Sequence, residues 1–422
     1  MTIPQSLANL LSREQEWVIE AVRAIAAHEA MPAYLVGGAV RDWLLGRRID
    51  DLDFAVEGDA IDFTRALARA HGGEMQAHER FRTATWVAQG QAVDVVTARA
   101  ETYERPAALP RVTPAAITDD LLRRDFTVDA LALALRDNRL IDVCDGQGDL
   151  QRRLIRALHA RSFIDDPTRI FRAARYAARL DFAVEAETRA WIDHGLPHVG
   201  ALSGERVKYD LELIFVEQAP ARPLSLLREW GVFRAVGIAI PEDDLLTARF
   251  ARLVDALAAD TWDFGSPGMS DDDLRRAAGW GALVYNLGQM SVSRWIDWIP
   301  FTAELRNTLV SLGALSTLSA QAFGGPPSRQ SELLSAFSGL ALWLGWLFDR
   351  NPLKQQAMWR EWHTWRRIQP ITTGEILKAR GLPPGPRYGQ LLGRLRNAWL
   401  DGEVTTPEDE GRLLDTLLRL TA

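Results

Sequence analysis

Two aspartates, Asp51 and Asp53, have the clearest capacity for chemistry in this sequence. They lie at the start of an apolar run that ends at Val56, which we expect to form a strand, and residues two apart in a strand project from the same face. Like charges held together normally destabilise a fold, and a divalent metal ion is the usual reason for such a pair. The spacing therefore predicts a metal site.

A pair of glycines, Gly37 and Gly38, precedes these aspartates and follows a short apolar run. Glycine lets a backbone turn approach a ligand closely, and the helix that we expect over 39–45 offers free N–H groups to an anion at its start. Alone, a double glycine is more often a plain turn, and an isolated Asp-x-Asp is more often a solvated strand edge or loop. Together, the two features point to a metal-bound nucleotide.

The order and spacing of these residues resemble a known motif. Gly-Gly-Ala-Val-Arg-Asp at 37–42, followed by Asp-Leu-Asp at 51–53, is similar to the first motif of the nucleotidyltransferase superfamily that includes DNA polymerase beta. More narrowly, it resembles class II CCA-adding enzymes and bacterial poly(A) polymerases. The resemblance implies that Asp51 and Asp53 hold two Mg²⁺ ions, and that Gly37, Gly38 and Arg41 lie near the triphosphate.

Asp94 is an acid within the otherwise apolar run Val93–Thr97. One interpretation is a polar position on an edge strand, and the other is a third catalytic carboxylate on a neighbouring strand. The superfamily commonly places an acid there, so the resemblance favours the catalytic role.

Arg123, Arg124 and Asp125 stand near the start of a helix that we expect over 119–135. Locally, an acid in a first helical turn complements the helix dipole. In the resemblance these residues form the Arg-Arg-Asp motif, in which Arg124 and Asp125 select a ribonucleotide through its sugar and phosphates.

A second strong motif begins at Asp165-Asp166-Pro167 and continues to Arg169. An acid before proline predicts a helix start, and Asp166 and Arg169 could simply form an i,i+3 ion pair. The resemblance instead identifies the Glu-Asp-x-x-Arg motif, in which Asp166 and Arg169 choose C or A without a nucleic-acid template.

Arg169, Arg172 and Arg175 fall on roughly one helical face, with few acids between them in the sequence. We expect them to repel one another unless a polyanion is near, and we include Arg172 and Arg175 among the nucleotide-binding residues. The chain departs from the family pattern at four positions. It has Asp129 where the family usually has Asn, Asp165 where it has Glu, Lys208 where it has Arg, and Asp210 where it has Glu.

The segment 373–389, a Gly-Pro-rich turn before a helix, is unremarkable by itself but resembles the family's tail. By that resemblance Lys378, Arg380 and Arg387 contact tRNA phosphates.

Composition is compatible with a nucleic-acid enzyme. The 422 residues carry a net charge of −7, yet many arginines cluster between 152 and 179, while acids gather at 241–244 and 270–273. The single cysteine, Cys144, excludes an internal disulfide framework.

We find neither a signal peptide nor an apolar run long enough to span a bilayer, and we predict a cytoplasmic protein with no membrane contact.

The expected fold is an α/β head followed by helices only. Short strand-like runs are expected at 34–36, 52–56, 83–87, 93–97 and 140–143, a first helix over 1–30, and another helix over 59–71. Beyond about residue 150 we expect no strands, and we interpret most of the 15 tryptophans as core. We divide the chain into a nucleotidyltransferase head (1–150), a nucleotide-selecting neck (151–220), a body (221–350) and a tRNA-binding tail (351–422).

The leading hypothesis is an enzyme that adds CCA to the tRNA 3′ end from CTP and ATP with Mg²⁺, and releases pyrophosphate by two-metal catalysis. Alternatives are a poly(A) polymerase or an enzyme that adds only CC or only A. A non-catalytic RNA-binding protein ranks lower because both Asp51 and Asp53 are present. A His-Asp phosphohydrolase domain is not indicated, since none of the seven histidines precedes an aspartate. We predict no protein partner.

Overall fold

The computed structural model describes residues 4–79, 82–259, 262, 269–287 and 289–420. Its contacts divide the chain into two compact units, the first comprising 1–214 and 222–237 and the second 215–221 and 238–422. We describe each unit by itself. The finer division into head, neck, body and tail stays a prediction.

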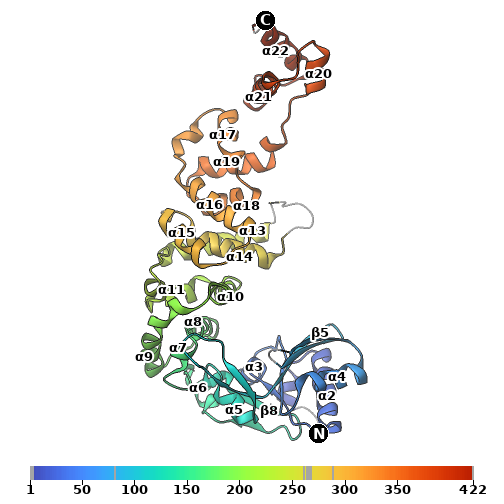
Figure 1. The fold of residues 1–422 in the computed structure, drawn as a ribbon, viewed down its shortest axis with the longest axis vertical. Helices are drawn as coiled ribbons and strands as arrows, with labels where there is room; N and C mark the ends of the chain where they lie inside the picture. The colour runs from blue at the N-terminus through green and yellow to red at the C-terminus, as the bar shows by residue number, and fades with distance from the viewer. Residues whose placement is uncertain (1–3, 80–81, 260–261, 263–268, 288, 421–422) are drawn as a thin grey trace. The chain divides into compact units, whose positions relative to one another are not determined.

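A seven-stranded mixed sheet forms the centre of the first unit (Figure 1). The strands β2 and β5 run parallel, and the other neighbouring pairs run antiparallel. In spatial order the strands are β3 (Glu74–His78), β4 (Thr83–Ala88), β5 (Gln91–Thr97), β2 (Asp53–Val56), β1 (Ala33–Val36), β8 (Leu131–Ala134) and β9 (Leu140–Asp142). This arrangement confirms the expected mixed sheet.

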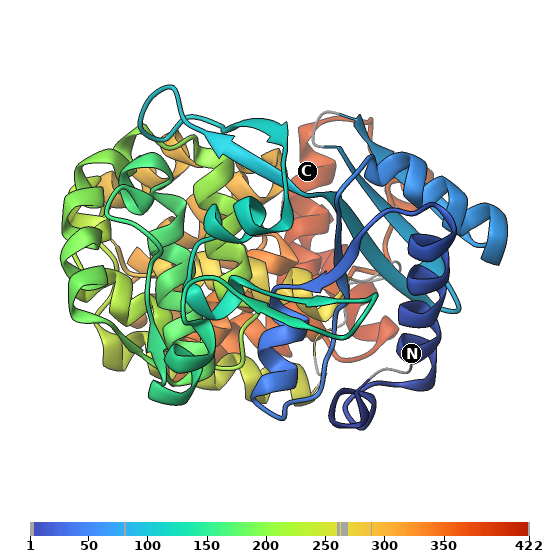
Figure 2. The ribbon, with the colours of Figure 1, turned by 90° about the horizontal axis from the view of Figure 1, so that it is seen from below.

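Helices cover the sheet and connect its strands. The expected first helix is divided into α1 (Gln5–Ala8) and α2 (Arg13–His28), because Ser12 forms a capping box with Gln15 that begins a new helix. Helix α2 packs beside α4 (Ala60–His71), as Figures 1 and 2 show. A separate hairpin of β6 (Arg99–Thr102) and β7 (Arg111–Pro114) leads to α5 (Ile117–Leu122).

The expected helix over 119–135 is wrong. Only α5 and the short 3-10 turn η2 (Thr127–Asp129) are helical there, and the chain then enters β8. All four residues of β8 are buried between β1 and β9. Leu and Ala favour helices in isolation, so pairing with two neighbouring strands has overridden local propensity.

Helices dominate the rest of the first unit. They are α6 (Gly146–Arg152), α7 (Ser162–Asp165), α8 (Thr168–Leu180), α9 (Ala186–Gly195), η3 (Leu196–Ala201), α10 (Gly204–Phe215), α11 (Ala221–Glu229) and α12 (Val232–Ala235). The expectation that strands end near residue 150 is wrong in one detail. Two short strands, β10 (Leu154–Ile155) and β11 (Ala183–Val184), pair in parallel on either side of α8 in the sequence.

The described part of the second unit is built from helices. They are α13 (Asp243–Ala259), α14 (Asp271–Val284), α15 (Gln289–Trp298), α16 (Ala303–Thr317), η4 (Ala320–Gly324), α17 (Pro327–Leu334), α18 (Gly339–Phe348), α19 (Pro352–His363), η5 (Trp365–Arg367), α20 (Gly374–Ala379), α21 (Pro386–Asp401) and α22 (Pro407–Leu420). Trp280, Trp295 and Trp343 are buried, as expected for core tryptophans.

The helices of the described ranges are short or contain charged residues. None of them alone is long and apolar enough to cross a bilayer, although the bent pair α17 and α18 passes by length and composition. Most of α18 is buried within its own unit.

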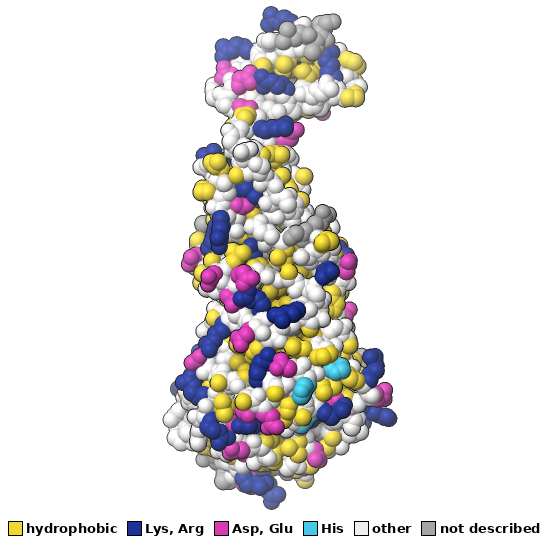
Figure 3. Space-filling model, turned by 90° about the vertical axis from the view of Figure 1, so that its left-hand side faces the viewer, with side chains coloured by type: hydrophobic (Ala, Val, Ile, Leu, Met, Phe, Trp, Pro, Cys, Tyr) yellow, Lys and Arg dark blue, Asp and Glu magenta, His cyan; other side chains and the backbone are white. Residues whose placement is uncertain are grey.

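Charges are mixed on the molecular face in Figure 3, where Lys and Arg side chains are interspersed with Asp and Glu. Many arginines of the 152–179 region have acidic partners. Arg152 and Arg156 both pair with Asp149, at 2.8 and 3.0 Å. The arginine-rich region is therefore largely neutralised by local ion pairs.

Candidate active site

A pocket of about 650 Å³ opens where β2 begins, beside the middle of β5, and all the residues that line it belong to the first unit. That volume falls in the usual range for a small-molecule site. The sequence-predicted residues that line it are Gly37, Gly38, Arg41, Asp51, Asp53, Asp94, Arg124, Asp125, Asp166, Arg169 and Arg172. The fold thus brings segments far apart in the sequence into one cavity.

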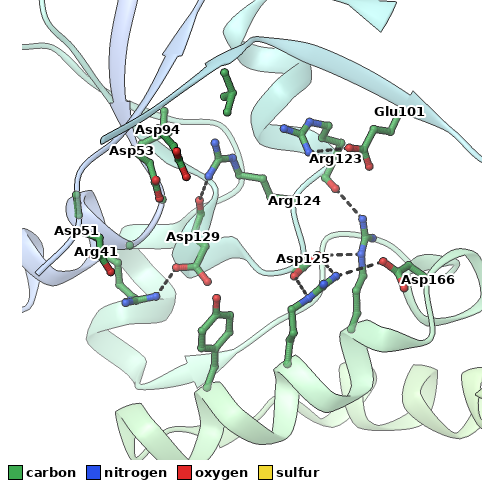
Figure 4. A pocket seen from close by; sticks show the side chains of 18 of the residues that line it. Arg41, Asp51, Asp53, Asp94, Glu101, Arg123, Arg124, Asp125, Asp129 and Asp166 are labelled. Atoms are coloured by element: carbon green, nitrogen blue, oxygen red, sulfur yellow. Dashed lines mark hydrogen bonds and ion pairs between the residues drawn. The ribbon is translucent and has the colours of Figure 1, made fainter. Parts of the chain in front are cut away.

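Strand register places two of the carboxylates side by side. Asp53 is the first residue of β2 and lies directly opposite Asp94 of the parallel strand β5 (Figure 4). Asp51 precedes the strand instead of lying within it, yet it faces the same pocket. Asp94 accepts a hydrogen bond of 2.6 Å from the hydroxyl of Thr85 on β4.

The carboxylates disfavour one another's charge. Asp53 opens onto the pocket but is closely surrounded by protein, and this desolvation, followed by the charges of Asp94 and Asp51, raises its pKa to about 6. Arg124 acts in the opposite direction. A bound cation would relieve this repulsion.

Divalent metal ions fit this group of residues by donor type and by charge, because carboxylate oxygens are the ligands that Mg²⁺ prefers. Across the described ranges, no three His, Cys, Asp or Glu side chains already converge as a ready-made metal cluster. Asp51, Asp53 and Asp94 are therefore candidate ligands, and their role stays a prediction.

The glycine turn has a conformation that favours glycine. Gly37 ends β1 with φ at 65°, in the left-handed region, and Gly38 begins α3 (Gly38–Leu44). A Cβ atom at Gly37 would lie 3.0 Å from a guanidinium nitrogen of Arg124. The turn therefore has arginine packed closely against it.

Arg41 is only 4% exposed and makes ion pairs with two acids. Its Nε and Nη2 each donate 2.9 Å hydrogen bonds to Asp42, and Nη1 donates a 2.6 Å bond to Asp129. Burial alone would lower the pKa of Arg41, but the Asp129 and Asp42 charges raise it instead. Asp129 also lines the pocket, although the sequence did not place it among the candidates.

Asp125, the acid of the Arg-Arg-Asp segment, links this segment to helix α8 by ion pairs. Asp125 forms ion pairs with Arg169 at 2.9 Å and with Arg172 at 2.6 Å. Arg169 and Arg172 therefore share a counter-charge from a segment more than forty residues away, which the expected repulsion between them did not take into account.

Asp166 lies between α7 and α8, two residues before the first residue of α8, so the predicted helix start is close to the observed one. Its carboxylate accepts bonds from the backbone N–H and hydroxyl of Thr168, at 3.0 and 2.6 Å, and pairs with Arg206 and Arg172. Burial would raise the pKa of Asp166, but the charges of Arg172 and Arg206 lower it. Arg169 donates hydrogen bonds from Nη1 to the Ser162 hydroxyl and from Nη2 to the Arg123 carbonyl. The position of the Arg169 side chain is therefore not set by an i,i+3 ion pair with Asp166.

Four predicted residues lie elsewhere. Arg175 is not part of the pocket lining, and its guanidinium lies 5.3 Å from the centroid of the Tyr176 ring. Lys378, Arg380 and Arg387 belong to the second unit, where Arg380 pairs with Asp415. Their contacts with RNA stay a prediction.

Several lining residues were missed from the sequence. Glu101 of the β6–β7 hairpin pairs with Arg123 at 2.8 Å (Figure 4), and it also accepts a hydrogen bond from Tyr103. Tyr176 lies four residues after Arg172, and this helical spacing was the one available signal for it.

Asp210 of α10 is buried and faces the same arginine cluster. Desolvation raises its pKa to about 6, although the charges of Arg172 and Arg175 oppose this shift. An unfolded aspartate titrates near pH 4, so the folded state binds this proton more tightly. The contribution of Asp210 to the free energy of unfolding therefore becomes less favourable as the pH rises from about 4 to about 6.

We predict that Asp210→Asn raises the free energy of unfolding at pH 7.5 by about 1 to 3 kcal/mol, with a smaller gain at pH 5. Urea unfolding at both pH values measures this difference. Asp181→Asn is the matched control, because the pKa of this exposed acid is lowered by Arg222 and Arg153 and its replacement brings no such gain. An equal gain at both pH values would contradict the assignment.

Comparison with known proteins agrees with this geometry. Residues 33–156 match the family model described as the poly A polymerase head domain. An A-adding tRNA nucleotidyltransferase of Geobacter sulfurreducens is 31% identical over 91% of this chain and 45% of its own length. Another, of Halalkalibacterium halodurans, is 39% identical over 54% of this chain and 55% of its own length. The chain thus spans about half the length of these relatives.

A solved structure of a CCA-adding enzyme in an apo form is also similar to this chain. It has a TM-score of 0.81 and 26% sequence identity, and the match covers 99% of both chains. The mixed-sheet head and the helices that follow it are therefore those of this fold. Residues 33–156 therefore carry a poly A polymerase head domain, and the chain as a whole is similar in fold to a CCA-adding enzyme.

Proposed function

We propose that this chain is a template-independent nucleotidyltransferase that adds CCA to the 3′ end of tRNA from CTP and ATP. The observation that carries the proposal is the pocket itself, in which paired carboxylates of β2 and β5 face the acid–arginine cluster of α8. The first group suits metal-bound phosphate, and the second suits the sugar and base of a nucleotide. A tRNA substrate would place the protein in the cytoplasm.

In this proposal the 3′-hydroxyl oxygen of the RNA attacks the α-phosphate, a new phosphodiester forms, and pyrophosphate leaves. Asp51, Asp53 and Asp94 would hold Mg²⁺. When bound there, Mg²⁺ supplies Lewis-acid stabilisation of phosphate charge and lowers the pKa of the attacking hydroxyl. The N–H groups at Gly37 and Gly38 would orient the triphosphate.

Base selection would fall to Asp166 and Arg169. A carboxylate only accepts and a guanidinium only donates, so together they can distinguish the edges of C and A. Both side chains are already fixed by protein partners, Asp166 by Thr168 and Arg206, and Arg169 by Ser162. Such fixed groups suit a protein template. In the second unit, Lys378, Arg380 and Arg387 would bind tRNA phosphates.

An enzyme that adds only the terminal A is the second candidate. The relatives that are 31% and 39% identical are both named A-adding tRNA nucleotidyltransferases. Addition of CC only, and poly(A) synthesis, remain outcomes of the same test.

We predict that the purified protein completes tRNA lacking CCA when both CTP and ATP are supplied, and tRNA ending in CC when ATP alone is supplied. Sequencing the products at single-nucleotide resolution checks this. Extension of the CC-ended substrate alone would identify an A-adding enzyme. Long A tails, or no extension of either substrate, would sink the CCA proposal.

Asp53→Asn is expected to lower the rate of nucleotide addition by at least about a hundredfold, because it removes a charge that metal catalysis needs. Calorimetric titration with Mn²⁺ should show weaker binding in the same variant. Asp59→Asn is the control, since Asp59 caps α4 away from the pocket and asparagine caps helices equally well. Unchanged activity and Mn²⁺ binding in Asp53→Asn would refute the metal assignment.

Arg169→Ala should change the ratio of kcat/KM for CTP and ATP by about tenfold, as expected when a hydrogen-bonding group that reads a base is lost. Competition between the two nucleotides on one tRNA measures the ratio. Arg65→Ala, which removes an exposed arginine paired with Asp62 on α4, should leave it unchanged. Equal losses for both nucleotides in Arg169→Ala would assign this residue a structural role instead.

A further inference from the structure

Two guanidinium groups lie directly over the glycine turn of the pocket. A Cβ atom built on Gly37 would lie 3.0 Å from Nη1 of Arg124, and one built on Gly38 would lie 3.5 Å from Nη2 of Arg41. Both glycines therefore leave room for an arginine as well as for a ligand. How these arginines are held decides the shape and charge of this end of the pocket.

Asp129 contacts both arginines, as Figure 4 shows. Its carboxylate oxygen Oδ1 accepts a 2.6 Å hydrogen bond from Nη1 of Arg41. Its backbone carbonyl accepts a longer bond, 3.4 Å, from Nη1 of Arg124. Each arginine also has an acid from its own segment, Asp42 for Arg41 and Asp120 for Arg124. Asp129 is the residue that joins the two.

The second carboxylate oxygen of Asp129, Oδ2, is buried and has no hydrogen-bond partner among the described residues. A buried and half-satisfied carboxylate is costly, and such groups in native proteins call for an explanation. Burial raises the pKa of Asp129, and the charge of Arg41 opposes this shift. What stabilises Asp129 here is its contact with Arg41, which is itself 4% exposed.

We propose that Asp129 is a positioning residue that fixes Arg41 and Arg124 over the glycine turn and thereby sets how tightly the pocket holds the triphosphate of an incoming nucleotide. It acts through the two arginines and makes no contact with the base, so its effect is the same for CTP and ATP. The inference rests on the proposed function, because it needs a nucleoside triphosphate as the substrate.

The acid at this position has a specific consequence. An amide could accept the bond from Arg41, but it could not balance the charge of a buried guanidinium. Asp42 and Asp129 together engage three of the five N–H groups of Arg41. The Arg41 side chain therefore links α3 to the segment before β8 in a fixed position.

The test compares Asp129→Ala, which removes the side-chain acceptor of Arg41 but keeps the backbone carbonyl that Arg124 contacts, with Asp129→Asn, which keeps a side-chain acceptor but removes the carboxylate. With saturating tRNA, the KM of each nucleotide that the wild type incorporates should rise about tenfold in Asp129→Ala and about threefold in Asp129→Asn, as expected for the loss of a charge-assisted hydrogen bond. The kcat should change by less than about threefold. The partial rescue by asparagine distinguishes positioning from general damage.

Asp349→Asn is the matched control. Asp349 is another buried acid with a cationic partner, Lys354 at 2.6 Å, but it lies in the second unit, and its replacement should leave the nucleotide KM unchanged. Wild-type KM values in both Asp129 variants, or a rise for only one base, would overturn the inference. If Asp129→Ala does not fold, the nucleotide KM of Asp129→Asn alone tests the inference, and a wild-type KM value in that variant would overturn it. Absence of nucleotide addition by the wild type would instead reject the proposed function.

Discussion

The parallel pairing of β2 with β5 is the constraint on which the pocket depends. Its register aligns Val36, Asp53, Asp94 and Thr85 in one row across four strands, so two carboxylates face each other at the edge of the sheet. Like charges opposite each other in a sheet are destabilising. The sheet accommodates them because the row opens onto a wide polar pocket, and because Thr85 donates to Asp94.

The arginines around the pocket depend on a second constraint, the short segment between α5 and β8. Its acids Asp125 and Asp129, with Asp120 from the end of α5, neutralise arginines that come from α8, from α3 and from the segment itself. The guanidinium groups are thereby held in fixed positions before any ligand arrives. Preorganised charges of this kind are what a site for a phosphorylated substrate requires.

Several elements were predictable because their signals are local. Strands β1, β2, β4, β5 and β9 are apolar or β-branched runs bounded by turn residues, and α8 follows directly after an acid and a proline. Strand β8 was not predictable, since Leu-Ala-Leu-Ala favours a helix until β1 and β9 pair with it. Glu101 and Tyr103 were not predicted as site residues, because it is the β6–β7 hairpin that brings them to the pocket.

The sequence by itself determined the residue types and spacings: a glycine pair whose first member has a positive φ, an aspartate at the start of a strand with another two residues before it, and an acid followed by proline just before α8. Tertiary structure alone decided which charges meet. Arg169 pairs with Asp125 instead of its neighbour Asp166, and Arg41 pairs with Asp129, 88 residues away. The reason is physical, since an ion pair depends on distance in space, and these distances are set by the order of strands in the sheet.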